Sequence, residues 1–168
     1  AALFTDIGKY WWMVPLAVTA LPAALAVFWA VAAALAGLTP ARRLSRYVAV
    51  ILAFSALEWL RGTILSGFPW NLPGYAWLAL PSVMQGAALI GSYGLTILTI
   101  AAGGALACLA YGQLSYRLRV LPLAVCAVVL LALGLWGQNR LGEHPTRYHD
   151  DLVVRLVQPN TSFEEKRD

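Results

Sequence analysis

The stretch Glu58-Trp-Leu-Arg-Gly-Thr-Ile-Leu-Ser-Gly-Phe-Pro-Trp-Asn-Leu-Pro-Gly-Tyr75 places an acid and a base inside apolar sequence. An ionised side chain at the centre of a bilayer costs roughly 2.5 to 3.5 kcal/mol, so such residues face a partner, a water-filled cavity or a ligand. Glu58 and Arg61 are three residues apart, so on one helix they share a face and can pair. The prolines and glycines that follow predict a rigid turn at the membrane surface.

The composition is that of a polytopic membrane protein. Hydrophobic residues make up 60% of the chain and charged residues 12%, and the mean hydropathy is +0.68. Only nine of the twenty charged residues lie within residues 1–137, so the chain changes solvent near Gly137. The sequence pI near 9.3 comes with no clustered basic face, so we expect no nucleic-acid partner.

Four apolar segments are long enough, or nearly so, to span a bilayer, which takes about 20 residues: 11–38, 47–66, 91–111 and 120–135. The apolar sequence over 75–111 is too long for one perpendicular helix. Places to break it are Pro81, Gly86, Gly91 and Gly94. We expect residues 82–90 to form a short interfacial or re-entrant helix, which needs protein or a cavity around its irregular backbone.

Basic residues predict the orientation, because short cytoplasmic loops collect Lys and Arg. The loops 39–46 and 112–119 carry arginines and are predicted to be cytoplasmic. The connection that follows Arg61, and everything after about residue 138, is then predicted to lie on the outer side.

The end of the chain has a different pattern. Asp151-Leu-Val-Val-Arg-Leu-Val157 is typical of a buried strand, and residues 138–150 are predicted to form a linker. A single strand is not stable alone in water, so we expect 151–168 to begin a soluble domain that continues in a longer protein. The predicted fold class is an all-α polytopic membrane domain with about four transmembrane helices, plus the first β-strand of an α/β domain.

Several motifs occur in a recognisable order and spacing. They are Glu58-Trp-Leu-Arg-Gly62, Ser66-Gly-Phe-Pro-Trp70, Gly74-Tyr75, Gln85, Gly91-Ser-Tyr-Gly94 and Val157-Gln-Pro-Asn160. Together they resemble bacterial apolipoprotein N-acyltransferase over roughly residues 47–168, and residues 5–15 fit the same family more loosely. The sequence departs from the family at Arg167, where relatives have a Trp. This departure puts in doubt whether the function of that Trp in relatives is kept in this chain.

The resemblance implies a multi-pass enzyme of the bacterial inner membrane, with eight transmembrane helices and a periplasmic nitrilase-like (αββα) domain. The four spans correspond to the family's fourth to seventh helices. The family transfers an acyl chain from a membrane phospholipid to the N-terminal amino group of a diacylglyceryl apolipoprotein. The reaction passes through a thioester on a Cys, assisted by a Glu and a Lys. We expect a monomer with no cofactor and no metal.

None of those three catalytic residues has a matching position in this sequence, so we expect the chain alone to be inactive. Cys108 and Cys126 lie in apolar spans, where a buried thiol is inert, so neither is expected to be the nucleophile or to form a disulfide.

The candidate substrate-binding residues are Arg61, Trp70, Glu58, Gln158 and Asn160. Arg61 lies near the outer end of its helix, where a guanidinium can hold a lipid phosphate; alternatively it extends to the interface and pairs with Glu58 or a neighbouring carbonyl. Glu58 is expected to be structural, as the counter-charge of Arg61 or as the acceptor of a hydrogen bond from a neighbouring helix. Trp70 can pack on acyl chains or on the expected soluble domain, its turn can shape the mouth of a lipid cavity, or it can belong to an ordinary aromatic belt. Gln158 and Asn160 follow the predicted strand, where side chains of α/β domains often reach an active site.

Two other classes of protein remain open. A transporter or channel also has an intramembrane acid and base and helices broken by glycine, but needs no strand-forming tail. A non-catalytic membrane scaffold fits the spans equally well and predicts no nitrilase-like continuation.

Overall fold

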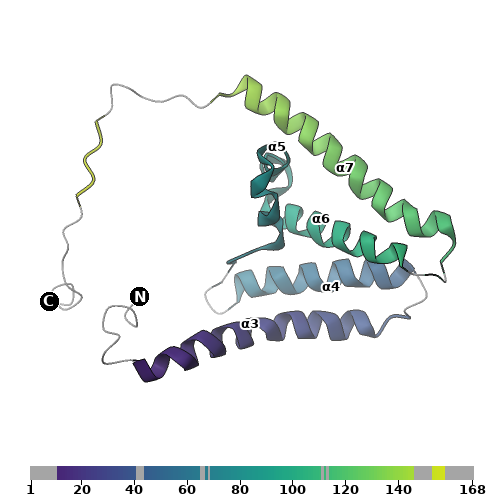
Figure 1. Ribbon diagram of the computed structural model, residues 1–168, viewed down its shortest axis with the longest axis horizontal. Helices are drawn as coiled ribbons and strands as arrows, with labels where there is room; N and C mark the ends of the chain where they lie inside the picture. The colour runs from purple at the N-terminus through teal and green to yellow at the C-terminus, as the bar shows by residue number, and fades with distance from the viewer. Residues whose placement is uncertain are drawn as a thin grey trace. The chain divides into compact units, whose positions relative to one another are not determined.

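The computed structural model describes residues 11–40, 44–64, 67, 69–110, 112, 114–145 and 153–157. Every regular element within these ranges is helical, which confirms the all-α part of the predicted fold (Figure 1). The strand predicted over 151–157 is not seen in its described part, because residues 153–157 form no regular structure and Val153 is 95% exposed. A strand requires a neighbour to pair with, so this element stays a prediction.

The chain divides into two compact units, residues 23–144 and residues 1–22 with 145–168. In the second of these the structure describes the 3-10 helix η1 (Trp11–Met13), the start of α3 and residues 153–157. The unit 23–144 holds the remaining elements: the rest of α3 (Val14–Gly37), α4 (Leu44–Thr63), the 3-10 helix η2 (Pro73–Ala79), α5 (Pro81–Met84), α6 (Ala87–Leu109) and α7 (Tyr116–Glu143).

Three helices in the described residues are long and apolar enough to cross a membrane: η1 with α3, α6 and α7. They contain 23 to 28 residues, or about 35 to 42 Å at about 1.5 Å per residue, which exceeds the roughly 30 Å hydrocarbon core. Large apolar side chains such as Leu131 are more than half exposed on their surfaces, as expected for helices covered by lipid. Helix α4 is not among them, because it contains Arg46, Glu58 and Arg61, so the fourth span stays a prediction.

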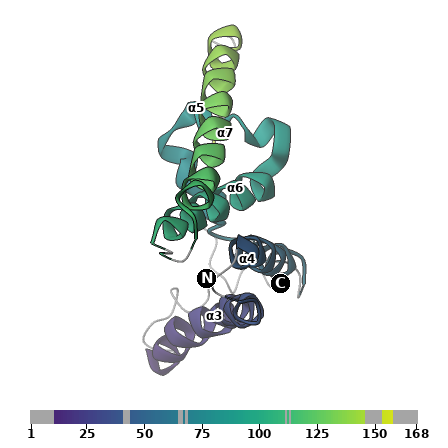
Figure 2. The same cartoon turned by 90° about the vertical axis from the view of Figure 1, so that its right-hand side faces the viewer.

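Helix α6 packs against both α4 and α7 (Figures 1 and 2). Its buried residues are small or apolar, among them Leu95, Ala105 and Cys108. The Tyr47 hydroxyl of α4 donates a hydrogen bond of 3.1 Å to the carbonyl oxygen of Ala101 in α6. This bond gives the hydroxyl a hydrogen-bond partner, and a polar group in apolar surroundings is unfavourable without one.

The segment between α4 and α6 contains less continuous helix than the sequence predicts. The element expected over 82–90 consists of α5, a turn, and the first turn of α6. Gly91 adopts φ 69° and ψ 175°, a conformation essentially restricted to glycine, so α6 is broken there before it continues to Leu109. The helices η2 and α5 pack on each other, with η2 also against α6 and α5 against α7.

Several helix ends differ from the predicted boundaries, most of all those of α7 and the start of α4. Helix α7 continues to Glu143, into the stretch assigned to a linker from residue 138. It begins at Tyr116, so Arg117 and Arg119 are helical and not part of the loop 112–119. Helix α4 begins at Leu44, so Arg46 is likewise helical and not part of the loop 39–46. Polar residues continue a helix beyond the hydrocarbon layer because its backbone groups remain hydrogen-bonded to one another. Apolar length alone therefore underestimates α7.

Candidate functional site

Glu58 and Arg61 form a buried ion pair in the last turns of α4. The Arg61 Nη2 group donates to Glu58 Oε2 at 2.5 Å, and the two residues are only 6% and 1% exposed. This is the i,i+3 pairing that the sequence spacing allows. A buried ion pair requires further hydrogen bonds to offset the loss of hydration of both charges, and the surrounding elements supply them.

The first of these bonds comes from α3. Trp29 Nε1 donates to Glu58 Oε1 at 2.5 Å, so each carboxylate oxygen accepts a hydrogen bond. The Trp29 ring also meets Phe54 of α4 edge to face, with ring centroids 5.8 Å apart. Trp29 could not be identified from the sequence, because it lies 29 residues from its partner and no local spacing connects them.

The second bond fixes the connection that follows α4. Arg61 Nη1 donates to the carbonyl oxygen of Trp70 at 3.0 Å. The next residue, Asn71, has φ 54°, in the left-handed region that few residues other than glycine and asparagine tolerate. A continuous series of contacts therefore runs from Trp29 through the ion pair to the backbone of this connection.

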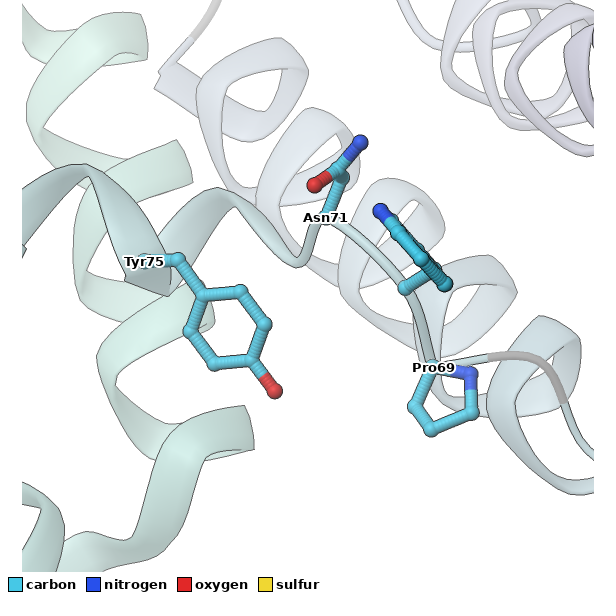
Figure 3. Close-up of a pocket in the computed structure, with 4 residues that line it drawn as sticks. Pro69, Asn71 and Tyr75 are labelled. Carbon is cyan, nitrogen blue, oxygen red and sulfur yellow. The ribbon is translucent and has the colours of Figure 1, made fainter. Parts of the chain in front are cut away.

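The same connection lines a hollow of about 330 Å³ (Figure 3). In Figure 3 the Tyr75 ring, from η2, and Pro69 flank the space, with Asn71 beside them. The fourth lining residue, Trp70, is 65% exposed. The hollow thus has aromatic and apolar walls with an amide and a phenol at its edge, and Arg61 holds the wall through the Trp70 carbonyl.

Threonines of α6 hold η2 in place. The Gly74 N–H donates to Thr96 Oγ1 at 3.2 Å, and Trp77 Nε1 donates to Thr99 Oγ1 at 2.8 Å. A Cβ at position 74 would lie 2.8 Å from the Thr96 backbone nitrogen, so only glycine allows this approach. Neither threonine could be identified from the sequence, because a threonine in an apolar helix gives no indication of which group it will bind.

The structure therefore brings three of the five candidate residues together: Glu58, Arg61 and Trp70. The other two, Gln158 and Asn160, lie outside the described residues. Cys108 and Cys126 are buried free thiols and neither lines the hollow.

Comparison with known proteins matches this chain to one family. Residues 1–105 match the family model described as the apolipoprotein N-acyltransferase N-terminal domain. Proteins named apolipoprotein N-acyltransferase are similar to the chain along nearly its whole length. The one from Caulobacter vibrioides is 40% identical and the one from Rhizobium rhizogenes 39%, each over 99% of this chain.

The chain spans 31% of the length of each of these two relatives. A third, from Bradyrhizobium diazoefficiens, is 37% identical over 96% of the chain and 30% of its own length. No solved structure matches the chain.

Proposed function

Because the chain belongs to the apolipoprotein N-acyltransferase family, we propose that the longer protein containing it transfers an acyl chain from a membrane phospholipid to a lipoprotein. The acceptor is the N-terminal amino group of diacylglyceryl-cysteine. The acyl group passes through a thioester on a Cys, assisted by a Glu and a Lys of a nitrilase-like domain outside these residues. Support comes from the names of the relatives and from three helices long and apolar enough to cross a membrane.

The part played by this chain is to hold the lipid at the membrane surface. The observation that carries this proposal is the aromatic hollow in the connection that follows α4. Arg61, a member of the buried ion pair, donates a hydrogen bond to the backbone of its wall. An exposed indole and a phenol suit the boundary between headgroups and acyl chains, where aromatic rings accumulate. Trp70 is the residue that contacts the lipid.

Arg61 and Glu58 act as positioning residues in this proposal. The Arg61 guanidinium is 6% exposed and is bound to Glu58 and to the Trp70 carbonyl, so it acts on the lipid through the wall that it fixes. We place the hollow on the periplasmic side of the inner membrane, as the basic loops predict, with Gln158 and Asn160 at the edge of the nitrilase-like active site.

The test is acyl transfer by the full-length protein from phospholipid to a diacylglyceryl-cysteine peptide, with Trp70→Ala compared with Trp59→Ala. Both indoles are more than half exposed, but Trp59 does not line the hollow. Loss of an aromatic contact with lipid is worth about 1.5 kcal/mol, or about tenfold in kcat/KM for the phospholipid.

The Trp59 variant should retain wild-type kcat/KM. Equal losses in the two variants would overturn the assigned role of the hollow. No transfer by a folded wild-type protein would overturn the enzyme itself and favour a transporter or scaffold.

A further inference from the structure

A second hollow, of about 310 Å³, lies at the C-terminal end of α7, whereas the basic first turn of this helix is at its N-terminal end. It is lined by Trp136, Asn139, Arg140, Glu143 and His144, and none of these residues belongs to the site beside Trp70. Its volume is at the lower end of the range for small-molecule sites, about 300 to 1,000 Å³. Unlike the first hollow, it contains a cation and an anion.

The place of this hollow along α7 corresponds to the headgroup layer. The apolar run of the helix ends at Leu135, Trp136 follows, and polar residues complete the last two turns to Glu143. Tryptophan marks the boundary of the hydrocarbon layer, so Arg140, one turn further, lies at the depth of lipid phosphates.

The Arg140 guanidinium is held in place by two neighbours. Arg140 Nη1 donates to Gln85 Oε1, between α5 and α6, and the guanidinium carbon lies 5.8 Å from the centre of the Trp136 ring. Gln85 takes one of the five N–H donors of the guanidinium, so others can bind a phosphate bidentately. A charged group fixed in advance binds with less loss of conformational entropy.

The carboxylate and the guanidinium in this hollow are not paired with each other. Arg140 and Glu143 line the same space, yet no ion pair joins these two described residues. A cation and an anion separated in one polar hollow complement a ligand that carries both charges. A lipid headgroup with a phosphate and an ammonium is such a ligand, whereas an anionic headgroup would meet the Glu143 carboxylate.

We propose that this hollow binds the headgroup of a zwitterionic phospholipid, with the phosphate on Arg140 and Asn139 and the ammonium on Glu143. The site is separate from the acyl-donor hollow proposed above, and its occupancy does not depend on acyl transfer. Gln85 is a positioning residue that orients the guanidinium.

The experiment is native mass spectrometry of the detergent-solubilised full-length protein, titrated with phosphatidylethanolamine, phosphatidylcholine, phosphatidylglycerol or inorganic phosphate. The variants are Arg140→Gln and Glu143→Gln. The control is Arg117→Gln, the same substitution in the exposed first turn of the same helix. Thermal unfolding of each variant is measured in parallel.

We expect Arg140→Gln to weaken the binding of phosphatidylethanolamine about tenfold, the equivalent of one charge-assisted hydrogen bond, and Arg117→Gln to leave it unchanged. Glu143→Gln should reduce the preference for phosphatidylethanolamine over phosphatidylglycerol. Arg140→Lys keeps the charge but loses the paired N–H donors, so it should bind phosphatidylethanolamine more tightly than Arg140→Gln and less tightly than wild type, and it provides the test if Arg140→Gln folds poorly.

Three results would overturn the proposal. Equal lipid binding by Arg140→Gln, Arg117→Gln and wild type would show that Arg140 only stabilises α7. Competition by inorganic phosphate at the lipid's own concentration would indicate a free-anion site. Tighter binding of phosphatidylglycerol than of phosphatidylethanolamine by the wild type would contradict the role of Glu143.

Discussion

Replacing Glu58 by Ala should strongly destabilise this protein, because Glu58 is a buried member of the ion pair in α4. The substitution removes the carboxylate that accepts hydrogen bonds from Arg61 Nη2 and from Trp29 Nε1, each at 2.5 Å. It removes the Glu58 carboxylate from beside an Arg61 side chain that is only 6% exposed.

The expected loss follows from these contacts. Removing one partner of a buried ion pair costs about 3 to 5 kcal/mol, because the remaining charge is uncompensated. The lost bond from Trp29 adds about 0.6 kcal/mol, the average for side-chain hydrogen bonds between membrane helices. Trp29→Phe should therefore cost only about that smaller amount, because the phenyl ring can keep the edge contact with Phe54.

Removing both charges together should be milder than removing one. In Glu58→Leu/Arg61→Met no charge remains to be buried, and replacement of a buried pair by apolar residues is often nearly neutral. The double variant still loses the bond from Trp29, worth about 0.6 kcal/mol, and the bond to the Trp70 carbonyl, worth about 1 kcal/mol. We expect the free energy of unfolding of the double variant to exceed that of the Glu58→Ala variant by about 2 kcal/mol or more.

The assay is reversible unfolding of the full-length protein by SDS in mixed micelles, followed by circular dichroism. Trp59→Phe, on the exposed face of α4, serves as the control for Trp29→Phe. If the double variant is as unstable as the sum of its two single variants, or if Glu58→Ala changes the unfolding free energy by less than about 0.5 kcal/mol, the buried pair is not what fixes this end of α4.

Two glycine pairs give further tests by the same unfolding measurement. Gly91→Ala should cost about 1 to 3 kcal/mol, because its φ of 69° and ψ of 175° exclude a Cβ, whereas Gly103→Ala in the same helix has open space and should be neutral or stabilising by up to about 1 kcal/mol. Gly137→Ala should cost about 1 to 3 kcal/mol and loosen α5 from α7, because its Cβ would overlap the Ser82 carbonyl, whereas Gly142→Ala meets nothing and should not destabilise. Equal effects within either pair would contradict the packing described here.

Much of the helical fold could be predicted from local sequence. Apolar length predicts α3, α6 and α7 because a membrane helix must present hydrocarbon over a fixed thickness, and Pro81, Gly86 and Gly91 mark where the backbone departs from a single helix. Apolar length does not predict the polar end of α7, because a helix continues in the headgroup layer without an apolar surface.

The candidate site could be predicted only in part. The spacing of Glu58 and Arg61 is a local property of α4, so their pairing follows from the sequence. The hydrogen bonds from Trp29 and to the Trp70 carbonyl join segments far apart in the chain or across a turn, and no periodicity records them. The same is true of Thr96 and Thr99, which hold η2.

The sequence by itself determined the class of the protein, its family motifs and the presence of a charged pair in apolar surroundings, because these depend on composition and on spacing within one helix. Only the tertiary structure decided what satisfies that pair, and that Arg61 braces the wall of a hollow through a backbone carbonyl. It also decided that Arg140 meets Gln85 across 55 residues. Directional hydrogen bonds of buried charges depend on where separate helices lie in space, which apolar patterning leaves open.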